Sequence, residues 1–326
     1  MRRSQIIGTG SYLPQKILTN RDLQEKVETT EQWILERTGI RERRIADEKE
    51  ASSDLAEKAA RRALEMAGIH VNDLDLIIVA TATPDMFFPS TACLVQERIG
   101  AKQAAAFDVN AACSGFLYGL SIADHYLRGG DFRNVLIVGS EVMSRIIDWS
   151  DRNTCVLFGD GAGAVVLGCT KEDRGVVSTH LHSDGKLWDL IQVPGGGSRI
   201  PPSASMVAEG LPFVKMKGNE TFKVAVRTLE EAVIETLKAN NLEAEEISLL
   251  VPHQANIRII RAVAQRLGLP MEKVMVNVDR YGNTSAASIP IALDEAVREG
   301  RVKDGDLLLF EAFGAGLTWA SALVRW

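Results

Sequence analysis

The chain has 326 residues, of which 46% are apolar and 25% are charged, a balance typical of soluble globular proteins with ample core. Its net charge of −6 argues against a general nucleic-acid-binding protein, so an anionic partner would have to meet a local basic patch. Four scattered cysteines without CxxC or zinc-like spacing predict a reducing compartment and no metal site. No window holds the roughly 20 apolar residues of a membrane span, and no secretory apolar core opens the chain, so we expect a cytoplasmic protein.

Helices and apolar strands alternate in the first half. An amphipathic helix is predicted over residues 52–68, followed by a strand at 74–82. A helix is expected at 114–128, with further strands at 135–140 and 164–168. Because these strands are apolar on both faces, they suit sheets covered by helices on both sides.

The same order returns in the second half, with a helix at 221–239 and a strand at 247–253, an offset near 173. Cys113 lies 17 positions before Gly130, and Asn283 lies 17 before Gly300. This spacing predicts that Cys113 and Asn283 hold equivalent places in two copies of one unit, at an offset of 170. The expected fold is a duplicated, layered α/β architecture whose halves span 1–172 and 173–326.

Two segments interrupt the repeat, residues 17–48 and residues 183–217. The first is charged, and the second is rich in Gly, Pro and Ser. Insertions on a rigid scaffold commonly carry ligand contacts, which we predict for both. For residues 195–210 a solvated excursion is an equal alternative.

Three side chains in the repeat carry reactive groups: the Cys113 thiol, the His253 imidazole and the Asn283 amide. Strand and helix ends of both copies are expected to bring them to one site, where the helix after Cys113 would favour its thiolate. The alternatives are a small buried thiol, a structural histidine and a helix-capping asparagine. Since no carboxylate is placed to orient His253, a protease-like triad is unsupported. The set predicts acyl-thioester chemistry.

Two glycine-rich runs have different interpretations. Gly314–Ala315–Gly316 follows the apolar strand at 307–313, and its backbone N–H groups could bind an oxyanion, or the run could be only a tight turn. In GDGAGAVVLG, residues 159–168, the glycines are spaced GxGxG and lead into a strand. A nucleotide-binding loop requires GxGxxG after a strand, so that function is rejected.

Five motifs together resemble β-ketoacyl-acyl carrier protein synthase III, the initiating condensing enzyme of bacterial fatty acid synthesis, which has a thiolase fold. They are DVNAACSGF, GDGAGAVVL, VPHQANIRII, YGNTSAASIP and EAFGAGLTWASALV. The resemblance covers essentially the whole chain. The order Cys-His-Asn distinguishes it from the elongating condensing enzymes, which carry Cys-His-His.

The resemblance implies a two-stage reaction without a permanently bound cofactor. Cys113 would take the acyl group from acyl-CoA, with the oxyanion held by backbone N–H groups of Cys113 and the 314–316 turn. His253 and Asn283 would then stabilise the enolate formed when malonyl-acyl carrier protein loses carbon dioxide. A homodimer is also implied.

Further roles follow from matching positions. Trp33 and Arg152 would flank the CoA adenine. Phe88 matches a residue that closes the acyl pocket across a dimer interface, and its large ring favours short primers. The remaining implied roles are CoA phosphate binding by Arg37, pantetheine-tunnel lining by Gly218 and Asn256, contact with the departing carboxylate by Phe313, and carrier-protein docking by Gln254, Arg258, Arg261 and Arg266. For the three arginines, which share one broad side of a helix, a solvated basic face is the alternative.

Two departures from the family pattern bear on function. Ala315 stands where a third glycine is expected, so its N–H can serve only if its backbone conformation suits an L-residue. Gln265 and Arg266 occupy two positions that are usually basic, which predicts weaker or rearranged carrier binding. Three other functions remain open: a related thiolase-fold acyltransferase, a polyketide or quinolone starter enzyme, and a non-catalytic partner subunit. Retention of all three reactive residues argues against the last, and a hydroxymethylglutaryl-CoA synthase would need a carboxylate that no motif supplies.

Overall fold

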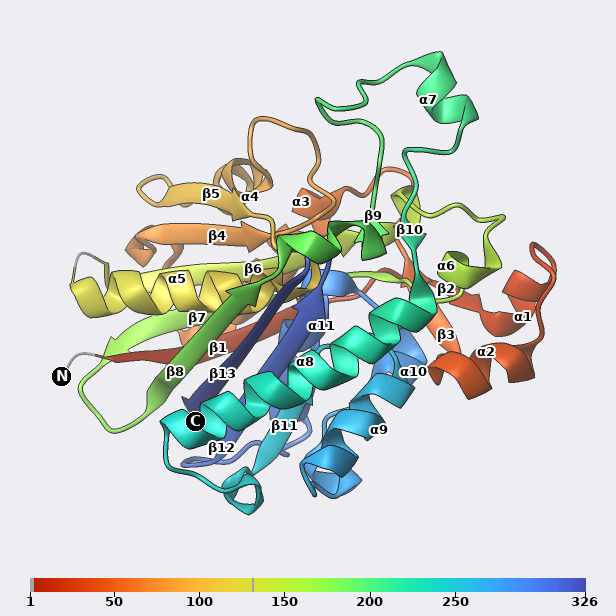
Figure 1. The fold of residues 1–326 in the computed structure, drawn as a ribbon. Helices are drawn as coiled ribbons and strands as arrows, with labels where there is room; N and C mark the ends of the chain where they lie inside the picture. The colour runs from red at the N-terminus through yellow and green to blue at the C-terminus, as the bar shows by residue number, and fades with distance from the viewer. Residues whose placement is uncertain (1–2, 131) are drawn as a thin grey trace.

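Two large sheets form the body of the protein, shown in Figure 1 as a computed structural model that describes residues 3–130 and 132–326. The five-stranded sheet has the order β1 (Arg3–Tyr12), β7 (Asp160–Thr170), β6 (Asn134–Val142), β4 (Leu76–Ala80) and β5 (Ala105–Val109). The four-stranded sheet has the order β11 (Leu249–Pro252), β12 (Leu307–Gly314), β13 (Thr318–Arg325) and β8 (Gly175–Ser183).

Helices cover both faces of each sheet. Between the sheets lie α5 (Gly115–Gly129) and α11 (Ser288–Arg298). The outer layers are α3 (Ser52–Ala67) with α4 (Thr91–Ile99), and α8 (Gly218–Ala239) with α9 (Ile257–Arg266). None of the helices among the described residues is both long and apolar enough to cross a membrane.

Neighbouring residues of one strand face different hydrophobic cores. This confirms the prediction that strands apolar on both faces are covered by helices on both sides. In β4, Ile78 packs in the central cluster with α5, whereas Ile77 packs in the outer cluster with α3 and α4. In β12, Phe310 faces the central cluster and Leu309 faces α8 and α9. Because side chains alternate along a strand, this burial on both sides gives five layers in the order helix, sheet, helix, sheet, helix.

The two sheets repeat one strand pattern. The parallel pair β4 and β6 is followed by antiparallel β7 and β1, just as parallel β11 and β12 are followed by antiparallel β13 and β8. The second copy has no full strand in the place of β5; a single bridge between Leu250 and Val274 stands there. Residue 172 lies between β7 and β8, and the division of the chain at that point stays a prediction.

The predicted equivalence of Cys113 and Asn283 is wrong by three residues. The starts of β4 and β11, of β6 and β12, and of α5 and α11 all differ by 173 positions. At this offset Cys113 matches Ala286, and Asn283 matches Asn110. The glycine spacing misled because α5 has 15 residues and α11 only 11, so the stop at Gly300 comes early.

The first insertion packs against the body, with β2 (Lys16–Thr19), α1 (Asn20–Gln24), α2 (Glu31–Thr38) and β3 (Glu42–Ile45). The second insertion contains β9 (Ile191–Gln192), α7 (Ala204–Ala208) and β10 (Lys215–Met216). Figure 1 shows α7 on an arm that stands away from the sheets. Two further short helices are α6 (Arg152–Cys155) and α10 (Val278–Tyr281).

Gly161, Gly163 and Gly168 of the 159–168 run lie inside β7, and Gly159 directly precedes it, so the run forms a strand and no phosphate-binding loop. A Cβ at Gly163 would stand 2.5 Å from the backbone nitrogen of Ile291 in α11. Gly163 therefore permits the close contact of α11 with the sheet, and the rejection of a nucleotide-binding loop is confirmed.

Candidate active site

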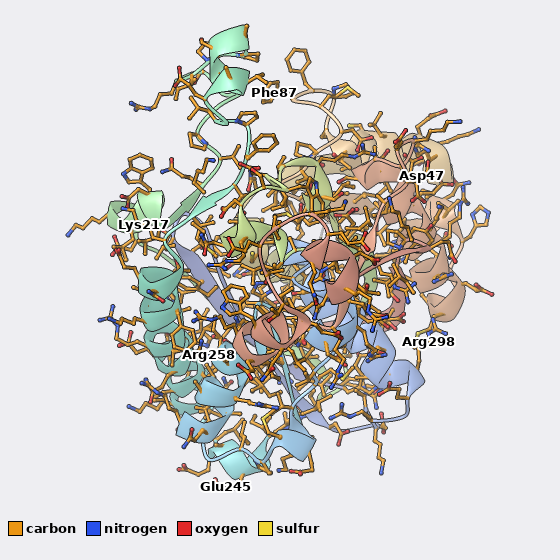
Figure 2. All side chains as sticks on the ribbon, turned by 90° about the vertical axis from the view of Figure 1, so that its right-hand side faces the viewer. Asp47, Phe87, Lys217, Glu245, Arg258 and Arg298 are labelled. Atoms are coloured by element: carbon orange, nitrogen blue, oxygen red, sulfur yellow. The ribbon has the colours of Figure 1, made fainter. Side chains whose placement is uncertain are left out.

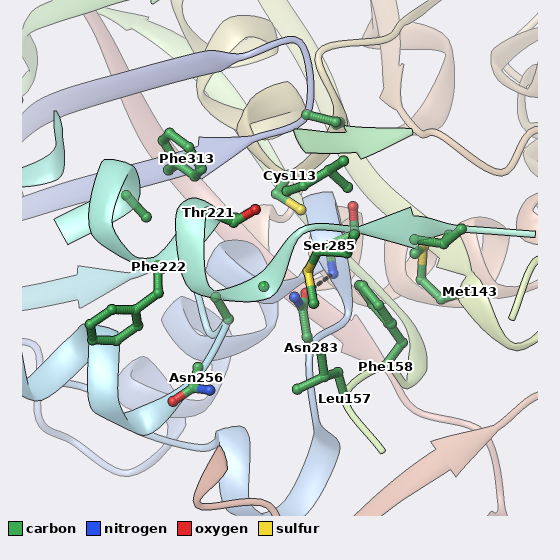
Figure 3. A pocket seen from close by; sticks show the side chains of 18 of the residues that line it. Cys113, Met143, Leu157, Phe158, Thr221, Phe222, Asn256, Asn283, Ser285 and Phe313 are labelled. Atoms are coloured by element: carbon green, nitrogen blue, oxygen red, sulfur yellow. Dashed lines mark hydrogen bonds between the residues drawn. The ribbon is translucent and has the colours of Figure 1, made fainter. Parts of the chain in front are cut away.

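One cavity of about 780 Å³ collects the three reactive residues, and Figure 3 shows Cys113 and Asn283 in its wall. Cys113, His253 and Asn283 all line it, although they come from different parts of the chain. Both insertions contribute to its walls, as predicted. The first supplies Trp33, Arg37 and Thr38, and the second supplies Ile191, Gln192, Val193, Val214 and Met216. Residues 195–210 line none of it, so the solvated excursion is the better description of that stretch.

Cys113 lies in a 3-10 turn, residues Ala112–Ser114, directly before α5. Ala112 has a left-handed φ of 47°, which is uncommon outside glycine and turns the chain sharply into the helix. A Cβ at Gly314 would stand 2.7 Å from the Cys113 nitrogen, so glycine is what lets β12 approach this backbone.

The expectation that the Cys113 thiolate is favoured is wrong for this structure. The cavity reaches Cys113, yet protein surrounds its sulfur, and this burial raises the pKa of the thiol to about 12. A hydrogen bond from Ser285 opposes the rise and the nearby charge of Glu141 adds to it. The dipole of α5 is therefore outweighed by desolvation, because a buried thiolate loses its hydration.

Alkylation of Cys113 in the free protein is expected to accelerate about tenfold per pH unit between pH 7 and 10, because only the thiolate reacts and the pKa lies above this range. Peptide mass spectrometry after timed treatment with iodoacetamide measures the rate, and Cys93 is the internal reference. A plateau of the Cys113 rate below pH 9 would contradict the burial argument.

Two polar residues beside Cys113 were not identified from the sequence. The Ser285 side chain lies beside both Cys113 and Glu141 and opposes the rise in pKa of each group. Glu141 is fully buried, and it accepts hydrogen bonds from Thr83 Oγ1 at 2.6 Å and from the Ala82 nitrogen at 3.1 Å. Burial raises the pKa of the Glu141 carboxyl. The internal repeat could have indicated Ser285, because alignment of residues 110–114 (NAACS) with residues 283–287 (NTSAA) places Ser285 opposite Ala112, next to Cys113.

His253 follows β11 and is 5% exposed. Its backbone N–H donates to the Glu311 carbonyl at 2.8 Å, which fixes the strand end beside β12. Its Nδ1 lies 2.6 Å from the Ser288 hydroxyl. Burial lowers the pKa of the imidazole to about 3, so His253 is neutral at physiological pH.

Asn283 forms a tight local turn. Its Oδ1 accepts a hydrogen bond from the Ser285 nitrogen at 2.8 Å, which leaves the Nδ2 group to donate into the cavity (Figure 3). Asn110 forms the same turn in the first copy, where its Oδ1 accepts from the Ala112 nitrogen at 3.2 Å. Ser285, like Ala112, has a left-handed φ, here 49°. The turn is thus a shared feature of both copies.

The 314–316 turn borders the cavity at Ala315. Ala315 is not among the described residues with a positive φ, so an L-residue fits here without strain. Phe313 is 6% exposed and lines the cavity beside Ala225 of α8. The substitution of the expected glycine is therefore compatible with a backbone N–H donor.

Glu311 is a buried carboxyl on β12, next to the strand that carries His253. It is 1% exposed, and its Oε2 has no hydrogen-bond partner among the described residues. Burial raises its pKa from an ordinary 4.5 to about 8. Its role is not predictable from the sequence, because its neighbours in the strand are apolar.

Glu311→Gln is expected to stabilise the protein more at pH 8 than at pH 5. Because the folded pKa lies above the unfolded one, the protonated carboxyl favours folding at low pH and that contribution disappears as pH rises toward 8, at about 1.4 kcal/mol per pH unit. Denaturant midpoints of both proteins at the two pH values measure it. An unchanged difference between the proteins would contradict a buried titrating carboxyl.

The residues predicted to bind CoA gather at the cavity mouth. Trp33 and Arg37 line it, and the guanidinium groups of Arg37 and Arg152 lie 4.9 and 4.8 Å from the Trp33 ring centroid. Gly218 and Asn256 also line the cavity. Asn256 is held on both sides, since its Oδ1 accepts from the Arg258 nitrogen and its Nδ2 donates to the Arg37 carbonyl.

The four residues predicted to dock a carrier protein separate into different environments. Gln254 is 1% exposed, and its amide bonds to the backbone of Pro252, Met275, Asn277 and Val278, so the docking prediction for Gln254 is wrong. Arg258 is exposed at the cavity mouth over the Phe222 ring, on the side of the molecule that also carries Lys217 (Figure 2). Arg261 is exposed, whereas Arg266 forms an ion pair with Glu230.

Phe88 does not reach the cavity of its own chain. It is 85% exposed, and Phe87 and Met86 beside it are 80% and 47% exposed. Three consecutive exposed apolar residues are unusual for a surface that stays in water. The role of Phe88 in an acyl pocket stays a prediction.

Comparison with known proteins gives a consistent result. The family models "3-Oxoacyl-[acyl-carrier-protein (ACP)] synthase III" and its C-terminal counterpart match residues 107–185 and 237–326. The chain is 58% identical over 325 residues, 100% of both chains, to "Beta-ketoacyl-[acyl-carrier-protein] synthase III" of Thioalkalivibrio sulfidiphilus. The crystal structure of 3-oxoacyl-[acyl-carrier-protein] synthase III from Aquifex aeolicus is 50% identical with a TM-score of 0.93, covering 99% of this chain and 100% of that one.

A similar structure of another pathway is the priming β-ketosynthase of R1128 polyketide biosynthesis, which is 37% identical with a TM-score of 0.92 and covers 99% of this chain and 96% of that one. The fold is therefore the thiolase fold expected from the sequence, and the activity is that of an acyltransferase that condenses acyl groups. On the strength of the full-length identity and the shared fold, the chain belongs to the 3-oxoacyl-[acyl-carrier-protein] synthase III family.

Proposed function

We propose that this cavity catalyses the decarboxylative Claisen condensation of a short acyl-CoA with malonyl-acyl carrier protein. The observation that carries the proposal is the convergence of Cys113, His253 and Asn283 on one cavity of about 780 Å³. The product is β-ketoacyl-acyl carrier protein, which starts fatty acid synthesis. No resident cofactor takes part in this scheme, and acyl-CoA is a substrate.

In the first stage, Cys113 Sγ attacks the thioester carbonyl of acyl-CoA. The new S–C bond forms as the bond from the carbonyl carbon to the CoA sulfur breaks, and the thiol proton ends on CoA. The N–H groups of Cys113 and Ala315 are the donors we assign to the oxyanion, because Gly314 brings the two backbones together.

In the second stage, malonyl-acyl carrier protein replaces CoA. Hydrogen bonds from His253 and Asn283 to its thioester carbonyl stabilise the enolate that forms as carbon dioxide leaves. The enolate carbon then attacks the acyl group on Cys113, and the sulfur is released. Phe313 presents an apolar surface to the departing carboxylate, which favours its conversion into neutral carbon dioxide.

CoA binding requires the mouth to open. An adenine ring placed between Trp33 and Arg152 needs stacking distances on both sides, roughly 7 Å in total, whereas the two groups now lie 4.8 Å apart. Arg152 is held by a hydrogen bond to the Glu28 carbonyl at 3.0 Å, which it would break on opening. Arg37 remains available for a CoA phosphate.

The carrier protein and a second copy of the chain are the proposed macromolecular partners. Arg258 and Arg261 give a basic surface at the mouth of a chain whose net charge is −6, which suits an acidic carrier. The exposed apolar residues 86–88 and the free edge of β5 support a homodimer. Four free cysteines support a cytoplasmic location.

Intact-mass analysis with a panel of acyl-CoAs tests the proposal. The protein should gain one acyl group, and the accepted lengths and branches identify the primer. Malonyl-acyl carrier protein and malonyl-CoA are then offered separately to the acylated protein. Failure of every acyl-CoA to label the protein would overturn the initiating role and favour a carrier-loaded starter unit, as in polyketide priming.

A further inference from the structure

We propose that Ser288 fixes His253 as the tautomer that carries its proton on Nε2. This makes Ser288 a positioning residue, since it acts through the imidazole and does not line the cavity. The inference refines the proposed function, because that function requires His253 to donate a hydrogen bond into the cavity. The tautomer itself can be tested without any activity.

The contact between the two residues is short and buried. Ser288 Oγ lies 2.6 Å from His253 Nδ1, and the side chains are 2% and 5% exposed. The same Oγ accepts a hydrogen bond from the Gln254 nitrogen at 3.3 Å. The Gln254 side chain is itself anchored to the Pro252 and Met275 carbonyls, so this donor is held in place.

Proton counting selects the tautomer. The Ser288 hydroxyl has one proton to give, and His253 Nδ1 is the acceptor that lies within reach among the described residues. If Nδ1 carried the imidazole proton, the hydroxyl proton would have no acceptor in a buried site, which is unfavourable. Since the imidazole is neutral, its single proton then lies on Nε2.

The internal repeat gives independent support. At the constant offset of 173, His253 matches Ala80 and Ser288 matches Gly115. At these two positions the first copy therefore has neither an imidazole nor a hydroxyl. The backbone of the unit does not need a serine at the first position of this helix, so the hydroxyl is present only where there is an imidazole to orient.

The chemical consequence is an assignment of roles. An imidazole with its proton on Nε2 donates to a carbonyl oxygen and cannot accept the Cys113 proton at that nitrogen. Ser288 should therefore matter for the stage in which carbon dioxide leaves, and not for transfer of the acyl group to Cys113.

Nitrogen NMR of histidine-labelled protein reads the tautomer directly. The chain has five histidines, and the His253→Ala variant identifies the signals of His253. We expect Nε2 to be protonated in the natural protein and in Ser288→Thr, which keeps the hydroxyl, and Ser288→Ala to give a mixture of tautomers. The control is Ser321→Ala, which removes a fully buried hydroxyl that bonds to Thr236 on the far side of the sheet. A proton on Nδ1 in the natural protein, or an unchanged tautomer in Ser288→Ala, overturns the proposal.

Kinetics supply the second readout. Ser288→Ala should lower kcat for condensation at least tenfold with little change in KM, while acyl loading of Cys113 stays within twofold of the natural protein. Ser288→Thr should restore most of kcat. Equal losses in loading and condensation would overturn the assignment to the second stage. If NMR gives the expected tautomer but no condensation occurs with any acceptor, the proposed function fails and the tautomer assignment stands.

Discussion

Cys113→Ala is expected to abolish acylation of the protein by acyl-CoA and to lower condensation by at least about 10³-fold, since removal of a covalent nucleophile eliminates the intermediate. The cavity wall should survive, because Ala differs from Cys only by the sulfur and the fold around residues 112–114 depends on backbone contacts. Intact mass after incubation with the preferred acyl-CoA measures loading, and formation of the β-ketoacyl-acyl carrier protein measures condensation.

Cys93→Ala is the matched control, because Cys93 is also a free and partly buried thiol but lies on α4, outside the cavity lining. It should load and condense like the natural protein. An acyl mass on Cys113→Ala would place the covalent intermediate on another residue and would remove the basis of the proposed mechanism.

His253→Ala is expected to leave acyl loading nearly intact and to lower condensation by about 10²- to 10³-fold, the usual effect of removing one donor to a developing oxyanion. The physical reason is that His253 is neutral, so it contributes a hydrogen bond and no charge at physiological pH. Loading by intact mass and carbon dioxide release separate the two stages in one preparation.

His125→Ala controls for the loss of an imidazole, since His125 lies on α5 and its Nδ1 contacts the Ser121 carbonyl away from the cavity. A His253→Ala variant that loses loading as strongly as condensation would indicate that His253 acts as a base for the Cys113 thiol. That outcome would also conflict with the tautomer assigned through Ser288.

The layered fold and its duplication could be predicted because they depend on local patterns. Strands such as 76–80 and 134–142 are apolar on both faces, and the helix at 52–67 has a narrow apolar side. The offset between the two copies was harder to predict, because the glycine that ends a helix marks the copies equivalently only if the helices have equal length. Helix α11 has 11 residues and α5 has 15, and the glycine spacing does not reveal this difference.

The polar surroundings of the reactive residues could not be predicted from the sequence. Glu141 and Ser288 act through partners that are 145 and 35 positions away, Ala286 and His253. Gln254 adjoins His253 in sequence and was assigned to the surface, yet its side chain turns inward to hold the backbone of α10. A sequence states which groups are present, but their direction is decided by tertiary packing.

The constant offset between the two copies has a consequence for how the chemistry is inherited. Both copies keep the asparagine turn, at Asn110 and Asn283, whereas the position of Cys113 holds Ala286 in the second copy and the position of His253 holds Ala80 in the first. Each copy therefore carries only some of the catalytic residues. The active site therefore forms where the two copies meet. A substitution that shifts one copy against the other would abolish activity even if every catalytic side chain were retained.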